Sequence, residues 1–79
     1  MEFMNIDVIK ERLNINNQVK FKLYSLDYLI EKVDDKYIIN AILYPDKKNS
    51  YSTIDELLDN YTIFNENIRD NEPRIQNIV

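Results

Sequence analysis

Apolar side chains near the start of the chain recur with the three- and four-residue spacing of an α-helix that buries one face. Ile6, Ile9 and Leu13 follow this spacing, and the charged residues between them fall mostly on other faces. We expect a short helix that begins at Asn5, whose side chain caps it by accepting a backbone N–H. The asparagine-rich run 14–17 ends the helix, because Asn tolerates the left-handed conformation that follows a helix.

The same spacing returns in the second half of the chain, where it predicts another helix. Its apolar stripe consists of Ile54, Leu57, Leu58 and Tyr61. Thr53 as N-cap and Glu56 three residues later form a capping box, with Ser52 and Asp55 as the alternative register. Asn60 helps to end this helix.

The segment between the helices begins with a predicted β-strand. Residues 19–24 alternate between apolar and polar side chains, so this strand has one buried face and one wet face. Lys20 and Lys22 lie on the wet face. Lysines at such positions protect the edge strand of a sheet from pairing with another molecule.

A hairpin follows this strand. Its two strands are residues 26–33 and 36–44, and the short polar side chains at 34–35 suit the tight turn between them. The second strand is apolar on both faces, which is more nonpolar surface than two short helices cover on one side of a sheet. We therefore expect another surface to meet it. Pro45 ends the strand, and residues 46–50 form a solvated loop.

The order helix, three strands, helix predicts an α+β fold. A small antiparallel sheet of three strands, or of four, carries the N-terminal helix and the second helix on one face. Residues 1–79 form a single small domain, which is near the lower limit of length for independent folding. After the second helix, Ile63, Phe64 and Ile68 indicate a short strand or turn followed by a helical turn over 65–71. Residues 73–79 form a flexible tail unless another segment holds them.

Composition narrows the function more than any motif does. The chain has no Gly, Cys, His or Trp. Without Gly there is no phosphate-binding loop, dinucleotide fingerprint, nucleophile elbow or EF-hand turn, since each needs a glycine at a fixed place. Without Cys and His there is no common zinc site, thiolate nucleophile or Ser-His couple. We expect no enzyme, no cofactor and no metal.

Charge and hydropathy indicate where the protein works. The net charge of −4 opposes simple binding to a phosphate backbone, for which a basic surface is typical. No apolar run reaches the length of the core of a signal peptide or of a membrane helix. We expect a cytoplasmic protein outside the membrane. Residues with AT-rich codons, such as Ile, Asn and Lys, are abundant, which points to a low-GC bacterium, its phage or a plasmid as the source.

Several short motifs resemble those of a group of small proteins. They are Phe21-Lys22-Leu23, Tyr28-Leu29-Ile30, Tyr37-Ile38-Ile39 and the run from Thr53 to Asn60 followed by Ile63. Over 21–70 the chain is similar to short uncharacterised α+β proteins of low-GC Gram-positive bacteria and their phages. Those proteins carry Gly before the second strand and after the last helix, where this chain has Leu26-Asp27 and Asn65-Glu66. The resemblance implies the α+β fold and no particular activity.

The tyrosine content favours a protein-binding surface. Six tyrosines in a chain without Trp supply large contact areas, each with one polar end. The predicted protein-binding residues are Tyr24, Tyr28, Tyr37, Ile42 and Tyr44. We expect a non-enzymatic interaction module that binds another protein or a second copy of itself, and the sequence leaves a homodimer open. The alternative is that some of the tyrosines fill a core short of Leu and Phe.

A narrower form of this hypothesis is an accessory protein of a phage or plasmid that binds a host protein. It would present carboxylates in place of phosphate, and the predicted acidic face is Asp55, Glu56 and Asp59. The simpler interpretation is that acids near the start of a helix complement the helix dipole.

The alternative function is the binding of single-stranded nucleic acid. The predicted site is Lys20, Lys22 and Tyr24. Cations and rings on a sheet face contact phosphates and stack on bases. Whether Tyr28 and Tyr37 lie on the same face depends on the strand register, which the sequence does not fix.

Overall fold

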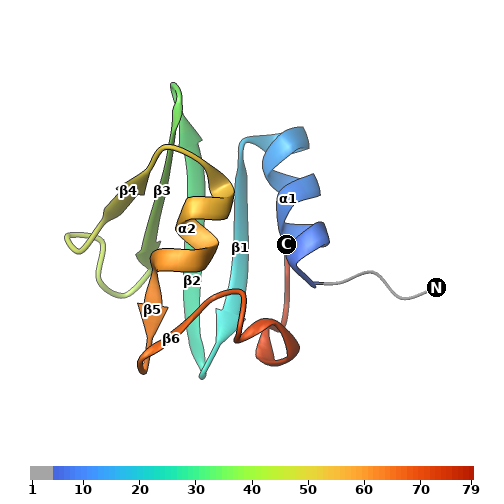
Figure 1. Cartoon of the computed structure of the whole chain (residues 1–79), viewed down its shortest axis with the longest axis vertical. Coiled ribbons are helices and arrows are strands. Elements are labelled where there is room, and N and C mark those ends of the chain that lie inside the picture. The colour runs from blue at the N-terminus through green and yellow to red at the C-terminus, as the bar shows by residue number, and fades with distance from the viewer. Residues whose placement is uncertain (1–4) are drawn as a thin grey trace.

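Four antiparallel strands form the central sheet, and each pairs with the next strand in chain order (Figure 1). The computed structural model describes residues 5–79, and the first four residues of the predicted domain lie outside this range. Both helices pack on one face of the sheet. The predicted α+β class is confirmed. The elements are α1 (Asn5–Asn16), β1 (Gln18–Leu23), β2 (Leu26–Val33), β3 (Lys36–Ala41), β4 (Asn49–Tyr51), α2 (Ile54–Asn60), β5 (Thr62–Ile63), β6 (Glu66–Asn67) and the 3-10 helix η1 (Glu72–Arg74).

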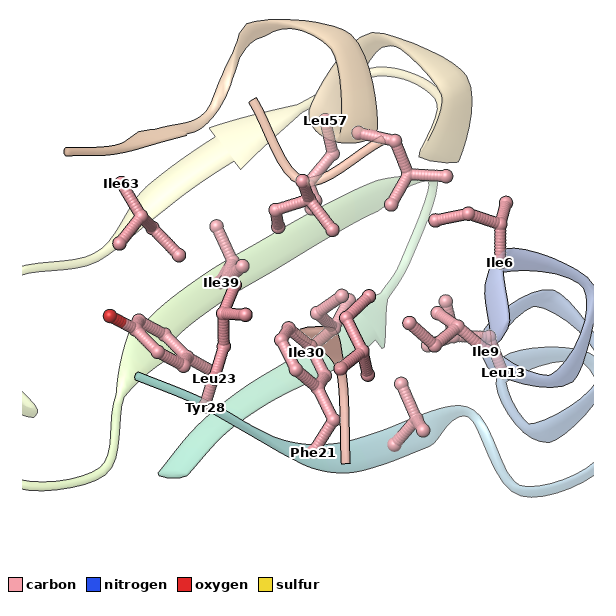
Figure 2. Packing of buried hydrophobic residues seen from close by; sticks show 14 of the residues in the cluster. Ile6, Ile9, Leu13, Phe21, Leu23, Tyr28, Ile30, Ile39, Leu57 and Ile63 are labelled. Atoms are coloured by element: carbon pink, nitrogen blue, oxygen red, sulfur yellow. The ribbon is translucent and has the colours of Figure 1, made fainter. Parts of the chain in front are cut away.

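The core lies between the helices and the sheet face beneath them (Figure 2). Alternate residues of β1 point to this face, and the register places Tyr28 opposite Phe21 and Ile30 opposite Val19. The buried hydrophobic residues come from both helices, from three strands of the sheet and from the segment that follows α2. They are Ile6, Ile9, Leu13, Val19, Phe21, Leu23, Tyr28, Ile30, Ile39, Ala41, Leu57, Leu58, Ile63, Ile68 and Ile75.

Turns between the strands adopt left-handed backbone although the chain has no glycine. Tyr24 and Ser25 join β1 to β2 with φ of 53° and 64°, and Phe64 and Asn65 join β5 to β6 with φ of 53° and 68°. Two consecutive residues of this kind form the type I′ turn, whose twist matches that of antiparallel strands. Asp34, with φ of 56°, lies in the turn predicted at residues 34–35. Each such residue costs about 1–2 kcal/mol without glycine, so the flanking strand pairs must offset this strain.

Helix α1 is longer than predicted and is capped differently. It continues to Asn16, and Asn17 then takes the expected left-handed conformation with φ of 60°. The side chain of Asn5 was expected to accept a backbone N–H. Instead its amide donates to the C=O of Glu72 at 2.8 Å, and the Glu72 carboxylate accepts the N–H of Ile6 at 3.1 Å. The prediction for Asn5 is wrong because a distant segment caps the helix.

Helix α2 begins as predicted. Thr53 precedes it in extended conformation, and its hydroxyl accepts the N–H of Glu56 at 3.0 Å. The helix ends at Asn60, and the N–H of Tyr61 donates to the C=O of Leu57 at 2.9 Å. The N-cap prediction is therefore confirmed.

The third strand ends earlier than predicted. β3 stops at Ala41, although the N–H of Ile42 still donates to the C=O of Asp27 at 2.9 Å. Because β2 begins at Leu26, it has almost no backbone left to pair with residues after Ile42. The chain turns there, and the N–H of Tyr44 donates to the C=O of Ala41 at 2.9 Å. After this turn, β4 pairs with β3 where a solvated loop was expected.

Another segment holds the predicted tail. Ile75 is buried, and backbone hydrogen bonds join residues 76–79 to β1. β1 is therefore covered along its outer edge, which Figure 1 shows near the C-terminal end of the chain. The prediction that Lys20 and Lys22 protect an open edge strand is wrong, because that edge already has a partner.

Candidate interaction face of the sheet

Neither helix covers the face of the sheet opposite the core, although Asn40 on that face is buried, with 6% of its surface exposed. Helices α1 and α2 and the buried part of the segment after α2 all pack on the inward face. The register assigns every second residue of each strand to the opposite side. We call this surface the open face; its residues are Gln18, Lys20, Lys22, Asp27, Leu29, Glu31, Val33, Lys36, Ile38, Asn40, Ile42 and Ser50.

Four apolar residues cross the open face along β2 and β3. Leu29 lies opposite Asn40, and therefore diagonal to both Ile38 and Ile42, while Val33 lies diagonal to Ile38 at the hairpin end. Diagonal neighbours are about 7–8 Å apart, which large side chains span. Val33 is 45% exposed and Ile42 is 40% exposed, and the other two are half-buried. We call Val33, Ile38, Leu29 and Ile42 the apolar ridge.

Charged side chains flank the apolar ridge. Lys20 and Lys22 lie on β1, and Asp27 and Glu31 lie on β2. Lys22 is opposite Asp27 in the register, but every ion pair among residues 5–79 involves other side chains. These four side chains therefore form no ion pair within the described residues.

The structure separates the five predicted protein-binding residues, and of these Ile42 lies on the open face. Tyr28 and Tyr37 point to the face that the helices cover. Tyr28 is 4% exposed and stacks on Phe21, with ring centroids 5.7 Å apart. Burial raises the pKa of its hydroxyl, and nearby Tyr61 adds to the effect. The prediction that Tyr28 belongs to a binding surface is wrong, because its register opposite Phe21 fixes it in the core.

The remaining two predicted tyrosines lie in turns. The Tyr24 hydroxyl donates to Oδ1 of Asn71 at 2.6 Å, and its ring meets Phe64 edge-on with centroids 5.0 Å apart. Since Asn71 is fully buried, this bond ties the β1–β2 turn to the segment after β6. Tyr44 is exposed, with Nζ of Lys47 at 5.7 Å from its ring centroid.

Two of the three predicted acidic residues already have cationic partners. Asp55 contacts Lys10 at 2.8 Å and Arg69 at 3.0 Å, and Asp59 contacts Arg69 at 2.6 Å. Hydrogen bonds from Lys10 and then from Arg69 lower the pKa of Asp55. Glu56 has no ion pair within residues 5–79, so one carboxylate of the predicted acidic face is left without a cation.

The predicted nucleic-acid residues do not form a stacking platform. Lys20 and Lys22 lie on the open face, whose residues include no aromatic side chain. Tyr24 lies beyond β1 in the turn, where its hydroxyl is bonded to Asn71. The three predicted residues are therefore not arranged as one surface of rings and cations.

A separate hollow of about 530 Å³ lies between α1, α2 and the inward face of the sheet. Leu13, Tyr37 and Ile54 supply its apolar lining, and Lys10 and Lys32 supply cations. Lys10 is paired with an aspartate, and Nζ of Lys32 lies 5.9 Å from the ring centroid of Tyr37. Both cations thus have contacts within the chain.

Sequence reasoning missed Leu29, Ile38 and Val33 as surface residues. A signal was present: Leu29 and Val33 point to the opposite side from Tyr28 and Ile30, so both faces of strand 26–33 carry apolar side chains. Only the register shows which set faces the helices.

Comparison with known proteins finds no matching family model, no matching curated protein and no matching solved structure. The similarity to short α+β proteins of low-GC Gram-positive bacteria therefore stays a prediction. Within residues 5–79 no cluster of three or more potential metal ligands is present. None of the helices in that range has the length and apolar character needed to cross a bilayer.

Proposed function

We propose that this chain is a non-enzymatic protein-interaction module that binds its partner through the open face. The observation that carries the proposal is the apolar ridge of Val33, Ile38, Leu29 and Ile42, which neither helix covers. An antiparallel sheet with one wet face normally carries polar side chains there. A contiguous apolar strip with a polar rim is typical of protein interfaces.

The charges beside the ridge favour a partner surface that carries both signs. Lys20 and Lys22 form one margin, Glu31 lies between the β2 ridge residues Leu29 and Val33, and Asp27 precedes Leu29 on the same face. Charges at a rim orient a partner and exclude wrong ones more than they add affinity. Burial of the ridge supplies the affinity, at about 25 cal/mol for each Å² of apolar surface removed from water.

A protein partner is favoured over single-stranded nucleic acid. A sheet that binds single strands offers rings to stack on bases and a basic groove for the backbone. The open face lacks such rings, and Asp27 and Glu31 lie near its lysines. The net charge of −4 also opposes a polyanion.

The non-enzymatic part of the proposal is supported by the groups whose pKa values are perturbed. Perturbed groups are candidates for catalysis when nothing else explains them. Hydrogen bonds from Lys10 and then Arg69 lower the pKa of Asp55, and those to Asp59 and then Asp55 raise the pKa of Arg69. Burial raises the pKa of the remaining three groups, which are Tyr28, Tyr51 and Tyr61. Contacts within the chain thus account for these five groups without a substrate.

Two kinds of partner fit this proposal. One is a second copy of the chain, and the other is a different protein. A host protein bound by an accessory protein of a phage or plasmid is the form favoured by the abundance of residues whose codons are AT-rich.

Photo-crosslinking tests the proposal. A photoreactive amino acid replaces Ile38 on the apolar ridge, and the matched control carries it at Ile15, which is 64% exposed on α1. In the source cell we expect crosslinks from position 38 and none above background from position 15. A product of twice the chain mass identifies a second copy, and any other mass identifies a different protein. Equal crosslinking from both positions, or none from position 38, contradicts the proposal.

A further inference from the structure

Residues 76–79 lie along the outer edge of β1 as a short additional strand. The N–H of Lys22 donates to the C=O of Gln76 at 2.7 Å, and the N–H of Gln76 donates back at 2.9 Å. Lys20 and Val79 exchange a second pair of bonds, at 3.3 and 2.9 Å. The segment thus extends the sheet antiparallel to β1.

This pairing is imperfect. The segment advances three residues from Gln76 to Val79 while β1 advances two from Lys22 to Lys20, so an extra residue bulges opposite Phe21. Asn77, within the bulge, has a left-handed φ of 52°. Within residues 5–79, no side-chain hydrogen bond or ion pair holds 76–79. The backbone bonds and the partial burial of Ile78 are what keep the segment in place.

The side chains of the segment do not complement the charges beside them. Gln76 is paired with Lys22, and Val79 is paired with Lys20, so the side chain opposite each lysine carries no charge. Neither lysine takes part in an ion pair within residues 5–79. A carboxylate at either paired position would therefore be favourable, because cross-strand pairs of opposite charge stabilise a sheet.

The edge of β1 also has room beyond this pairing. A hollow of about 420 Å³ adjoins Val79 and is lined by Asn16, Gln18, Val19, Lys20 and Val79. The first residues of β1 border this hollow. A strand longer than 76–79 can therefore continue along β1 through the hollow.

We propose that the outer edge of β1 is a strand-addition site for an extended acidic segment of a partner protein, which displaces residues 76–79. The incoming backbone takes over the bonds to Lys20 and Lys22 without a bulge, and its alternate carboxylates face the two lysines. This inference rests on the proposed protein-binding role, but it uses the edge of the sheet instead of the open face. Residues 76–79 act as a built-in competitor for the edge.

A disulfide lock tests the displacement in the full chain. Lys22→Cys combined with Gln76→Cys joins a hydrogen-bonded antiparallel pair, whose Cα atoms are about 5.5 Å apart, a distance that a disulfide spans. The chain has no other cysteine. The probe is a fluorescent peptide of about eight residues that alternates threonine with glutamate, and its binding is followed by anisotropy. We expect the reduced protein to bind about tenfold more tightly than the oxidised protein. Equal binding overturns the proposal.

The charge preference is tested on the native edge. The unmodified chain is expected to bind the glutamate peptide about tenfold more tightly than a peptide with lysine in place of glutamate, and Lys20→Glu combined with Lys22→Glu reverses this order. Equal binding of the two peptides overturns the acidic part of the proposal. Asn77→Gly removes strain from the bulge and so stabilises residues 76–79 on the edge of β1. Because these residues compete with the peptide, the variant is expected to bind the peptide more weakly.

A variant of the open face separates the two proposals. Ile38→Gln changes the apolar ridge on β3, two strands away from β1, without adding charge, and is expected to leave the affinity for the glutamate peptide unchanged. Loss of peptide binding in this variant would overturn the assignment to the edge. If the peptide experiments fail while crosslinking at the open face succeeds, the edge proposal alone is wrong.

Discussion

The carboxylate of Glu72 accepts the backbone N–H of Ile6 at 3.1 Å, although 66 positions separate the two residues. The first turn of an α-helix leaves N–H groups without partners inside the helix, and negative charge is favourable there. Asn5 adds a second link by donating its side-chain amide to the C=O of Glu72 at 2.8 Å. The 3-10 helix η1, near the C-terminal end of the chain, therefore caps the start of α1.

Removal of this cap is expected to destabilise the fold. Glu72→Ala leaves the N–H of Ile6 without its acceptor and should lower the free energy of unfolding by about 1–2 kcal/mol. Glu72→Gln keeps an acceptor without the charge and should lose less. Urea unfolding measures both, with the exposed residue of α1 changed in Glu11→Ala as the control. The same loss in Glu72→Ala and in Glu11→Ala would contradict the capping role.

Relief of backbone strain in the β1–β2 turn is expected to stabilise the chain. Ser25 is exposed and has a left-handed φ of 64°. Ser25→Gly should raise the free energy of unfolding by about 0.5–1 kcal/mol, because the relieved strain exceeds the entropy that glycine adds to the unfolded chain. Ser50→Gly in the extended strand β4 is the control and should lower stability. Loss of stability in both variants would contradict backbone strain at Ser25.

High pH is expected to weaken the core around Tyr28 and Tyr61. Burial raises the pKa of both hydroxyls above the ordinary value of 10.0, with Tyr61 adding to the shift of Tyr28 and Tyr51 adding to that of Tyr61. A raised pKa means that the folded state holds the proton more firmly, so the stabilisation is present below pH 10 and is lost as pH rises through the raised values. Thermal melts from neutral pH to about pH 11 measure this loss. Tyr61→Phe keeps the ring, so its alkaline loss should be smaller; an identical curve would contradict the assignment.

Low pH is expected to weaken the contact between α1, α2 and the segment after β6. Hydrogen bonds from Lys10 and Arg69 hold the pKa of Asp55 below its ordinary value of 3.8. A lowered pKa gives a stabilisation that is present above the ordinary value and lost as pH falls through the lowered one. Asp55→Asn should therefore have a lower melting temperature than the parent at neutral pH and the same melting temperature in acid. Added salt should reduce the difference in melting temperature at neutral pH. Asp46→Asn, in the β3–β4 loop, is the matched control and should melt with the parent throughout; a pH-independent gap for Asp55→Asn would refute the charge origin.

Local pattern was enough to predict both helices, the central hairpin and the fold class. The spacing of Ile6, Ile9 and Leu13 is a property of neighbouring residues, as is the pairing of Thr53 with Glu56 in the cap. Strand ends were harder to predict because they depend on the partner strand. Residues 42–44 continue an apolar run, but β2 offers almost no further backbone to pair with them.

The contacts that link distant parts of the chain left no local signal. Glu72 caps α1, Tyr24 bonds Asn71, and residues 76–79 cover β1, each across more than half of the sequence. The residues of the open face could not be predicted for the same reason, because they depend on contacts between distant segments. Tyr28 and Leu29 are adjacent apolar residues on opposite faces, and only pairing with β1 decides which of them reaches solvent.

The affinity of the open-face variant for its partner tests the central claim most directly. The measurement is titration calorimetry of Leu29→Arg combined with Ile38→Arg against the protein that crosslinks at position 38, or dilution calorimetry if that protein is a second copy. We predict a loss of affinity of about 30-fold or more, as expected for about 2 kcal/mol at an interface centre, with a melting temperature within a few degrees of the parent. Ile15→Arg on α1 should bind as the parent does. Undiminished affinity of the folded double variant would contradict the claim that the open face is the binding surface.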